Sequence, residues 1–279
     1  MTTLRFREPS IIPGFRLTFG FTIFYLMIIV LIPIAGLFLK TFELDWQTFT
    51  EIVTGPRFLA ALRLSFGASL LAAAFNAVIG VLVAWVLVRY DFPGKRALDA
   101  MVDLPFALPT AVAGIALASI YSPNGWIGSL VAPNGWRIAY TPLGIWIALV
   151  FIGLPFVVRS VQPVLQDFSK EIEEASATLG ASREQTIRRV ILPALLPAIL
   201  TGFSLAFARA VGEYGSVIFI AGNLPRQTEI LPLLIVFRLE EFNYAAAAAI
   251  AAVMLLASFA ILLAINLIQV WSQRRFGNG

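Results

Sequence analysis

The sequence EASATLGASREQTIRRVILP, residues 174–193, is a polar stretch that lies between two strongly apolar runs of the chain. Ser182, followed three residues later by Gln185, fits a capping box and predicts that a short helix starts near Arg183. Gly180 lies just before it and can adopt the left-handed backbone conformation that ends a helix. We therefore expect two short helices bent around Gly180 at a membrane surface, and we call residues 167–193 the elbow.

The first helix of the elbow has one apolar face. Ile172, Ala175 and Leu179 recur at helical spacing, so that the charged side chains among them point in other directions. A protruding elbow with such a face suits insertion into another protein. An amphipathic helix pair that lies at the membrane interface without a partner is the alternative interpretation.

The composition excludes a water-soluble domain and most enzyme chemistry. Of the 279 residues, 59% are hydrophobic and only 13% are charged. The sequence has no Cys and no His, which removes thiolate nucleophiles, disulfides and the commonest metal ligands. A Walker A motif is missing too, because Gly94-Lys95 lacks the upstream glycine and the phosphate-cradling loop. We expect no catalytic residue, no metal site and no cofactor in this chain, so any ATP hydrolysis must come from a partner.

Hydropathy predicts an all-α polytopic membrane protein, because several apolar runs exceed the ~20 residues that a helix needs to cross a bilayer. The third of six predicted spans is interrupted by Pro105 and Pro109 and should be kinked. The fifth should be broken near Gly212 and Gly215. The predicted spans are residues 17–39, 64–88, 98–121, 141–161, 194–220 and 245–271.

The distribution of Lys and Arg predicts the orientation of these spans. Basic residues are more frequent in the terminal segments, in the connection between the second and third spans and in the elbow than in the other connections. By the positive-inside rule the richer segments face the cytoplasm. The sequence thus predicts cytoplasmic tails at residues 1–16 and 272–279, a transmembrane domain over residues 17–271, and an elbow on the cytoplasmic side.

Arg209 and Glu213 are charged residues within the fifth predicted span. They lie four residues apart and can form an ion pair on one helix face. A charge near mid-bilayer usually faces a bundle interior or an aqueous cavity. Two interpretations stay open: a structural ion pair, or an anion path that includes Arg209, with Glu213 and Tyr214 near its outer mouth. Thr110 is a further candidate for the path, because Pro109 before it frees backbone carbonyls that can line a cavity.

Three other polar residues lie within predicted spans. Asp99 and Asp103, near the start of the third span, are four residues apart, and we expect them to pair with Lys95 or Arg96 at the cytoplasmic rim. Asn76 in the second span should form a hydrogen bond between helices.

The elbow also resembles a known signature. ABC importer permeases carry Glu-Ala-Ala, three residues, Gly, nine residues, Ile, one residue and Leu-Pro in the cytoplasmic loop that docks on the ATPase. Ser176 here stands for the second Ala and Val190 for Ile, which are mild departures. The resemblance implies a type I ABC importer permease fold with a coupling helix in the elbow. The residues that match, and to which the resemblance assigns coupling to the ATPase, are Glu174, Ala175, Gly180, Leu192 and Pro193.

Longer strings resemble one branch of this superfamily, the sulfate/thiosulfate permeases, and within it the T-type subunit. The resemblance covers roughly residues 15–269. It implies an importer of the bacterial inner membrane in which this subunit joins a second related permease subunit, a dimer of cytoplasmic ATPases that bind ATP and Mg, and a periplasmic sulfate/thiosulfate-binding protein. It also implies alternating access, with closure of the ATPases moving the elbows. The strings are RYDFPGKRALDAMVDLPFALPTAVAG (residues 89–114), PFVVRSVQPVLQ (155–166) and FARAVGEYGSVIFIAGN (207–223).

Three other functions are compatible with a polytopic membrane protein. A molybdate or tungstate permease is the alternative within the same class, since oxyanion importers share the architecture. An ion-driven secondary transporter is disfavoured, because the chain has no His, few buried acids and no visible repeat between its halves. A membrane-embedded scaffold or sensor without transport is the third possibility. Co-purification of an ATPase would separate the ABC permeases from the secondary transporter and from the scaffold.

Overall fold

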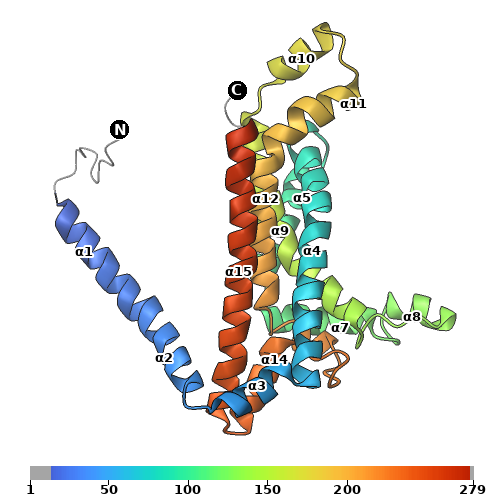
Figure 1. Cartoon of the computed structure of the whole chain (residues 1–279). Helices are drawn as coiled ribbons and strands as arrows, with labels where there is room; N and C mark the ends of the chain where they lie inside the picture. Colours follow the sequence, from blue (N-terminus) through green and yellow to red (C-terminus); the bar gives the residue numbers. More distant parts are fainter. Residues whose placement is uncertain (1–13, 277–279) are drawn as a thin grey trace.

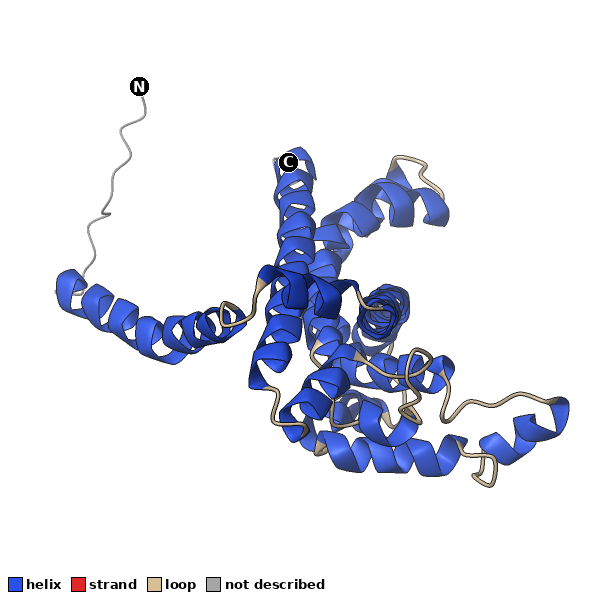
Figure 2. Cartoon of the chain, turned by 60° about the horizontal axis from the view of Figure 1, so that its bottom comes forward, coloured by secondary structure: helices blue, strands red, loops and turns tan. Residues whose placement is uncertain are grey.

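The computed structural model describes residues 14–276, which form helices joined by loops, with no strand among them (Figures 1 and 2). The predicted all-α fold is confirmed. Five helical regions of this part of the chain are long and apolar enough to cross a membrane. They are Leu17–Thr41, Pro56–Arg89, Pro142–Asp167, Arg183–Val211 and Tyr244–Val270.

The first of these regions departs from the rest of the bundle. It comprises α1 (Phe15–Leu26), a π-helical segment (Met27–Leu31) and α2 (Ile32–Thr41). Figure 1 shows α1 extending away from the other helices, while α2 returns toward them and contacts α15 (Tyr244–Phe276). Every side chain of α1 that the structure describes is therefore exposed.

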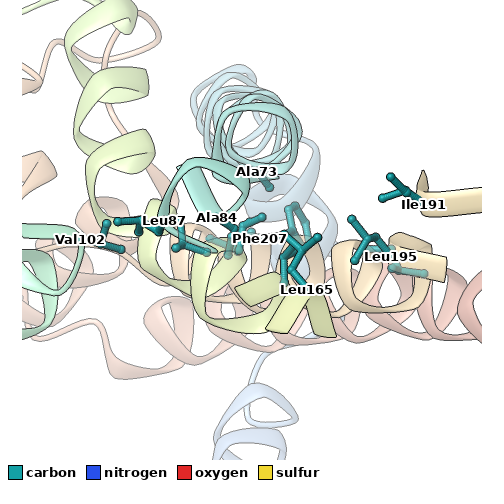
Figure 3. Close-up of a cluster of buried hydrophobic side chains, with 14 residues drawn as sticks. Ala73, Ala84, Leu87, Val102, Leu165, Ile191, Leu195 and Phe207 are labelled. Carbon is teal, nitrogen blue, oxygen red and sulfur yellow. The ribbon is translucent and has the colours of Figure 1, made fainter. Parts of the chain in front are cut away.

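Three long helices, α4 (Pro56–Arg89), α9 (Pro142–Asp167) and α12 (Leu192–Val211), pack along one another at the centre of the bundle. Small residues permit this packing, because they let the helix backbones approach one another closely. In lipid the hydrophobic effect does not drive helices together, so close van der Waals contact must supply the attraction. A Cβ added to Gly202 would lie 2.7 Å from Val157 Cα. The predicted interhelical hydrogen bond is confirmed: Asn76 Nδ2 donates to Val150 O at 3.0 Å. The buried cluster that these helices share includes Ala73, Ala84, Leu87, Leu165, Leu195 and Phe207 (Figure 3).

The predicted interruption of the third span is confirmed, but the prediction of one kinked span is wrong. The chain instead forms three pieces, α5 (Lys95–Val102), α6 (Leu104–Ala107) and α7 (Thr110–Tyr121). Pro105 lies in the first turn of α6, where the missing N–H has no helical partner to lose. Leu108 is extended, with ψ of 133°, because the following Pro109 disfavours the helical conformation at the residue before it. Two prolines four residues apart therefore divide the run rather than bend it.

The predicted break in the fifth span is confirmed. α12 ends at Val211, residues 212–216 are not helical, and α13 (Val217–Ile220) follows. α13 contacts α7. The last piece of the third predicted span therefore packs against the last piece of the fifth. We call residues 212–216 the break.

Two short helices lie at the end of the bundle opposite the elbow, α3 (Trp46–Thr54) and α14 (Leu231–Glu240) (Figure 1). α3 starts at Asp45, whose carboxylate accepts a hydrogen bond from the Thr48 N–H at 3.0 Å. That bond favours the ionised form and holds the pKa of Asp45 below its ordinary value. Two further short elements, α8 (Gly128–Val131) and a 3₁₀ turn (Ala132–Asn134), follow α7.

Candidate functional site: the elbow and the break

The elbow is built as its sequence predicts. α10 (Lys170–Thr178) ends just before Gly180, whose φ of 81° is left-handed. α11 (Arg183–Thr186) starts at a complete capping box, in which Ser182 Oγ accepts from the Gln185 N–H at 3.3 Å and Gln185 Oε1 accepts from the Ser182 N–H at 2.9 Å. The predicted turn at Gly180 and the helix start at Ser182 are confirmed. The second helix is not short, because α11 continues through a π-helical segment into α12 as one region, Arg183–Val211.

The apolar face of the elbow has no cover within the described chain. Leu179 is 88% exposed and Ile172 is 45% exposed, and Ala175 on the same face is exposed too. Glu174 and Gly180 are also exposed. Figure 1 shows α10 standing clear of the long helices at one end of the bundle, with α11 leading from it into α12. These residues are therefore available to a partner.

The other two signature residues lie where the elbow joins the bundle. Leu192 is 46% exposed and Pro193 is partly buried, both in the first turn of α12. A π-helical segment, Ile187–Ile191, comes directly before them. A proline cannot donate the usual helical hydrogen bond, and a π-helical turn is one way for a continuous helix to adjust to that loss. The signature thus spans both the tip and the root of the elbow.

Two contacts that hold the elbow were missed by the sequence reasoning. Arg89 Nη2 at the end of α4 lies 2.5 Å from Glu173 Oε1 on α10. Ser176 Oγ and Thr186 Oγ1 form a hydrogen bond of 2.8 Å between α10 and α11. A basic residue at the end of an apolar run signals only a membrane flank, so no local pattern could pair Arg89 with a residue 84 positions away.

At the break, Arg209 and Glu213 form the predicted ion pair. The Glu213 side chain is only 2% exposed, whereas that of Arg209 is 35% exposed. Glu213 Oε1 also accepts hydrogen bonds from the Ser216 N–H at 2.8 Å and from Ser216 Oγ at 2.9 Å. The carboxylate therefore ties the end of α12 to the start of α13 and compensates a buried charge with three donors.

Thr110 and Tyr214 reach the same region in different ways. A Cβ added to Gly215 would lie 2.1 Å from Thr110 Oγ1, so the start of α7 packs directly on the break. A Cβ added to Gly114, one turn further along α7, would lie 2.4 Å from Ser216 O. Tyr214 is partly buried and packs against a hydrophobic cluster of α4, α9 and α14. The structure therefore gathers Thr110, Arg209, Glu213 and Tyr214 around the break.

The expected partners of Asp99 and Asp103 were wrong. Both carboxylates pair with Arg159 of α9, at 2.7 Å to Asp99 Oδ1 and 2.6 Å to Asp103 Oδ2. Lys95 instead pairs with Asp91 at 2.8 Å. The planar guanidinium can bond two carboxylates at once, which a lysine on the same helix cannot do as well.

Residues 76–278 match the family described as binding-protein-dependent transport system inner membrane component. The chain belongs to this family, and it is a permease subunit of an ABC importer that does not itself catalyse ATP hydrolysis.

Relatives named sulfate transport system permease protein CysT are similar over nearly the whole chain. The protein of Salmonella typhimurium is 47% identical over 267 residues, which make up 96% of this chain and 95% of that protein. The protein of Synechococcus elongatus is 54% identical over 257 residues, 92% of each chain.

Solved structures support the same architecture. A chain of a bacterial alginate ABC transporter, in complex with a periplasmic protein that holds an alginate pentasaccharide, superposes with a TM-score of 0.75 at 18% identity. The match covers 95% of this chain and 96% of that one. A chain of the MetNI methionine ABC transporter, in an inward-facing conformation, gives 0.58 at 19% identity over 82% of this chain and 99% of that one. At these identities the likeness shows an ABC importer permease fold.

Proposed function

We propose that this chain is the T-type permease subunit of an ATP-driven importer of sulfate and thiosulfate. The observation that carries the proposal is the 47% identity to the Salmonella sulfate permease across 95% of its length, which includes the elbow and the break. This chain forms half of the translocation path, and a second, homologous permease subunit forms the other half.

The elbow is the proposed docking site for the cytoplasmic ATPase dimer. Its support is geometric: the signature residues Glu174, Ala175 and Gly180 are exposed at the tip, next to an uncovered Leu179. An apolar side chain that is 88% exposed at the tip of a structured helix gains most by entering a cleft on another protein. The ATPase supplies the ATP and Mg chemistry, and the elbow carries its closure to the bundle.

The proposed orientation places both termini and the elbow in the cytoplasm, and a periplasmic sulfate/thiosulfate-binding protein at the opposite end. Reporter fusions test it directly. Fusions after Arg96 and Glu184 should report a cytoplasmic location, and fusions after Ser122 and Glu229 should report a periplasmic one. A fusion after Glu184 that reports periplasmic would overturn both the orientation and the docking on the ATPase.

The proposed path passes the break, with Arg209 and Thr110 facing it and Glu213 and Tyr214 nearby. A dianion that enters against a negative-inside potential is opposed by about 2.3 kcal/mol per charge per 100 mV. The partly exposed guanidinium of Arg209 offsets part of this cost. Tight binding there is unnecessary, because the periplasmic protein can provide specificity.

Uptake of labelled sulfate tests the substrate. The complete complex, in vesicles with ATP and the binding protein, should accumulate sulfate, and thiosulfate should compete. A matched preparation without ATP is the control. Uptake of molybdate without sulfate would assign the chain to the molybdate and tungstate permeases, and uptake without ATP would assign it to secondary transport.

A further inference from the structure

Arg89 connects the elbow to the centre of the bundle. It is the last residue of α4, and its Nη2 lies 2.5 Å from Glu173 Oε1 on α10. The same nitrogen donates to Phe168 O, at the junction between α9 and α10, at 3.4 Å. The Arg89 guanidinium also lies 5.6 Å from the centre of the Trp85 ring, one turn earlier on α4. One side chain therefore contacts both the junction and the first helix of the elbow.

This contact is better protected from solvent than the ion pair on α11. The Arg89 side chain is 11% exposed and that of Glu173 is 30% exposed. The pair between Arg188 and Glu184 on α11 is 75% and 71% exposed. A shielded ion pair is screened less by salt and water, and loss of one partner leaves the other charge poorly solvated. The Arg89–Glu173 pair should therefore fix the position of α10, whereas the Arg188–Glu184 pair should not.

The opposite end of α4 is anchored in the same manner. Arg57, in the first turn of the helix, bonds both oxygens of Glu229, at 2.8 Å through Nε and 2.6 Å through Nη2. The Glu229 side chain is completely buried. Two residues further along the chain, the Leu231 N–H donates a hydrogen bond to Ser65 Oγ of α4 at 2.8 Å. The start of α14 and the residue two positions before it are thus bound to α4.

We propose that α4 is a rigid strut between the elbow and residues 229–231, and that Arg89 is the positioning residue through which a movement of the elbow displaces α4. α4 is 34 residues long, packs along α9 and α12, and has an arginine ion pair at each end. A displacement of α10 acts on Arg89 and shifts α4 along its axis. Arg57 and Ser65 then carry that shift to residues 229–231, where Ile230 belongs to the hydrophobic cluster against which Tyr214 of the break packs. The role of Arg89 in transport rests on the proposed function. Its role in positioning α10 does not.

The position of α10 can be measured without any transport assay. Because the natural sequence has no Cys, two spin labels can be attached to cysteines introduced at Val86 on α4 and Thr178 on α10, both exposed. In the full chain reconstituted in lipid, pulsed dipolar spectroscopy should give a narrow distance distribution. Arg89→Gln and Glu173→Gln should each broaden or shift it, and Arg89→Lys should do so less. The control Glu184→Gln should leave it unchanged. An unaltered distribution in Arg89→Gln would overturn the proposal.

The role in coupling needs the complete transport complex. Arg89→Gln and Glu173→Gln should each lower the sulfate transported per ATP hydrolysed by about fivefold or more, the lower end of the usual coupling between two sites. The exchanged pair, Arg89→Glu with Glu173→Arg, should recover part of that ratio. A ratio that stays at the wild-type value while both rates fall together would show an assembly defect and overturn the strut. If the wild-type complex transports no sulfate, the proposed function is wrong. The distance measurement still tests whether Arg89 fixes the position of α10.

Discussion

The elbow and the break are both bends that contain glycine, but different forces make them. At Gly180 the backbone is left-handed, and nothing lies within 4 Å of where its Cβ would be. At Gly215 the Cβ would collide with Thr110 Oγ1 on another helix. The first bend therefore depends on local conformation alone, and the second depends on tertiary packing. The elbow, which we propose docks on a partner, thus leaves its surface uncovered. The break lies inside the bundle and is packed against a neighbouring helix.

The largest effect expected from this comparison is that of Gly180→Val. A branched residue resists the left-handed backbone by about 1–2 kcal/mol and should redirect α10. We expect the protein to remain in the membrane, to lose most of its affinity for the ATPase and to lose sulfate uptake. Uptake and ATPase co-purification measure the result. Gly180→Asn is the matched control, because Asn tolerates this conformation. Uptake of Gly180→Val near the wild-type level would show that the bend is not needed for docking.

Gly215→Ala tests the packed bend. Its added methyl group must displace Thr110, and overpacking of this kind costs about 1–3 kcal/mol. The melting temperature of the purified protein should fall, and uptake should fall with it. Thr110→Ala in the same chain should restore part of both, because it removes the nearest atom. Gly212→Ala is the control within the break, since nothing lies within 4 Å of that Cβ. Equal effects at Gly212 and Gly215 would contradict the packing explanation.

Arg209→Ala separates a transport role of the break from a purely structural one. If the guanidinium faces the path, its loss should cut sulfate uptake about tenfold, equivalent to about 1.4 kcal/mol, with the complex still assembled. Arg209→Lys should keep part of the activity. Loss of assembly in Arg209→Ala, restored by a second change Glu213→Ala, would instead identify a structural ion pair.

Ser182→Ala should have the smallest effect and concerns the elbow again. It removes the side-chain acceptor of the capping box, which typically contributes about 1 kcal/mol to a helix. Affinity for the ATPase should fall severalfold, with membrane insertion unchanged. Ser182→Thr, which keeps the acceptor, is the control. A loss as severe as that of Gly180→Val would mean that the cap, rather than the bend, places α10.

The parts of the candidate site that could be predicted from sequence are those with short-range causes. The capping box at Ser182, the turn at Gly180 and the Arg209–Glu213 pair each involve residues within four positions of one another, so spacing alone identifies them. The Asp99 and Asp103 partners could not be found in this way. Lys95 and Arg96 are near in sequence, but only the crossing of α9 over α5 and α6 brings in Arg159.

The sequence by itself determined that the chain is an all-α membrane protein with a polar elbow, because hydropathy and helix capping act over one span or one turn. It also contained the signature by which the family is recognised. Only the tertiary structure decided that the third apolar run divides into α5, α6 and α7, that α7 packs on the break, and that Arg89 reaches Glu173 while Arg57 reaches Glu229. These contacts join residues far apart in the chain, and their free energy depends on shielding from water and on close backbone approach, which exist only once the helices are packed.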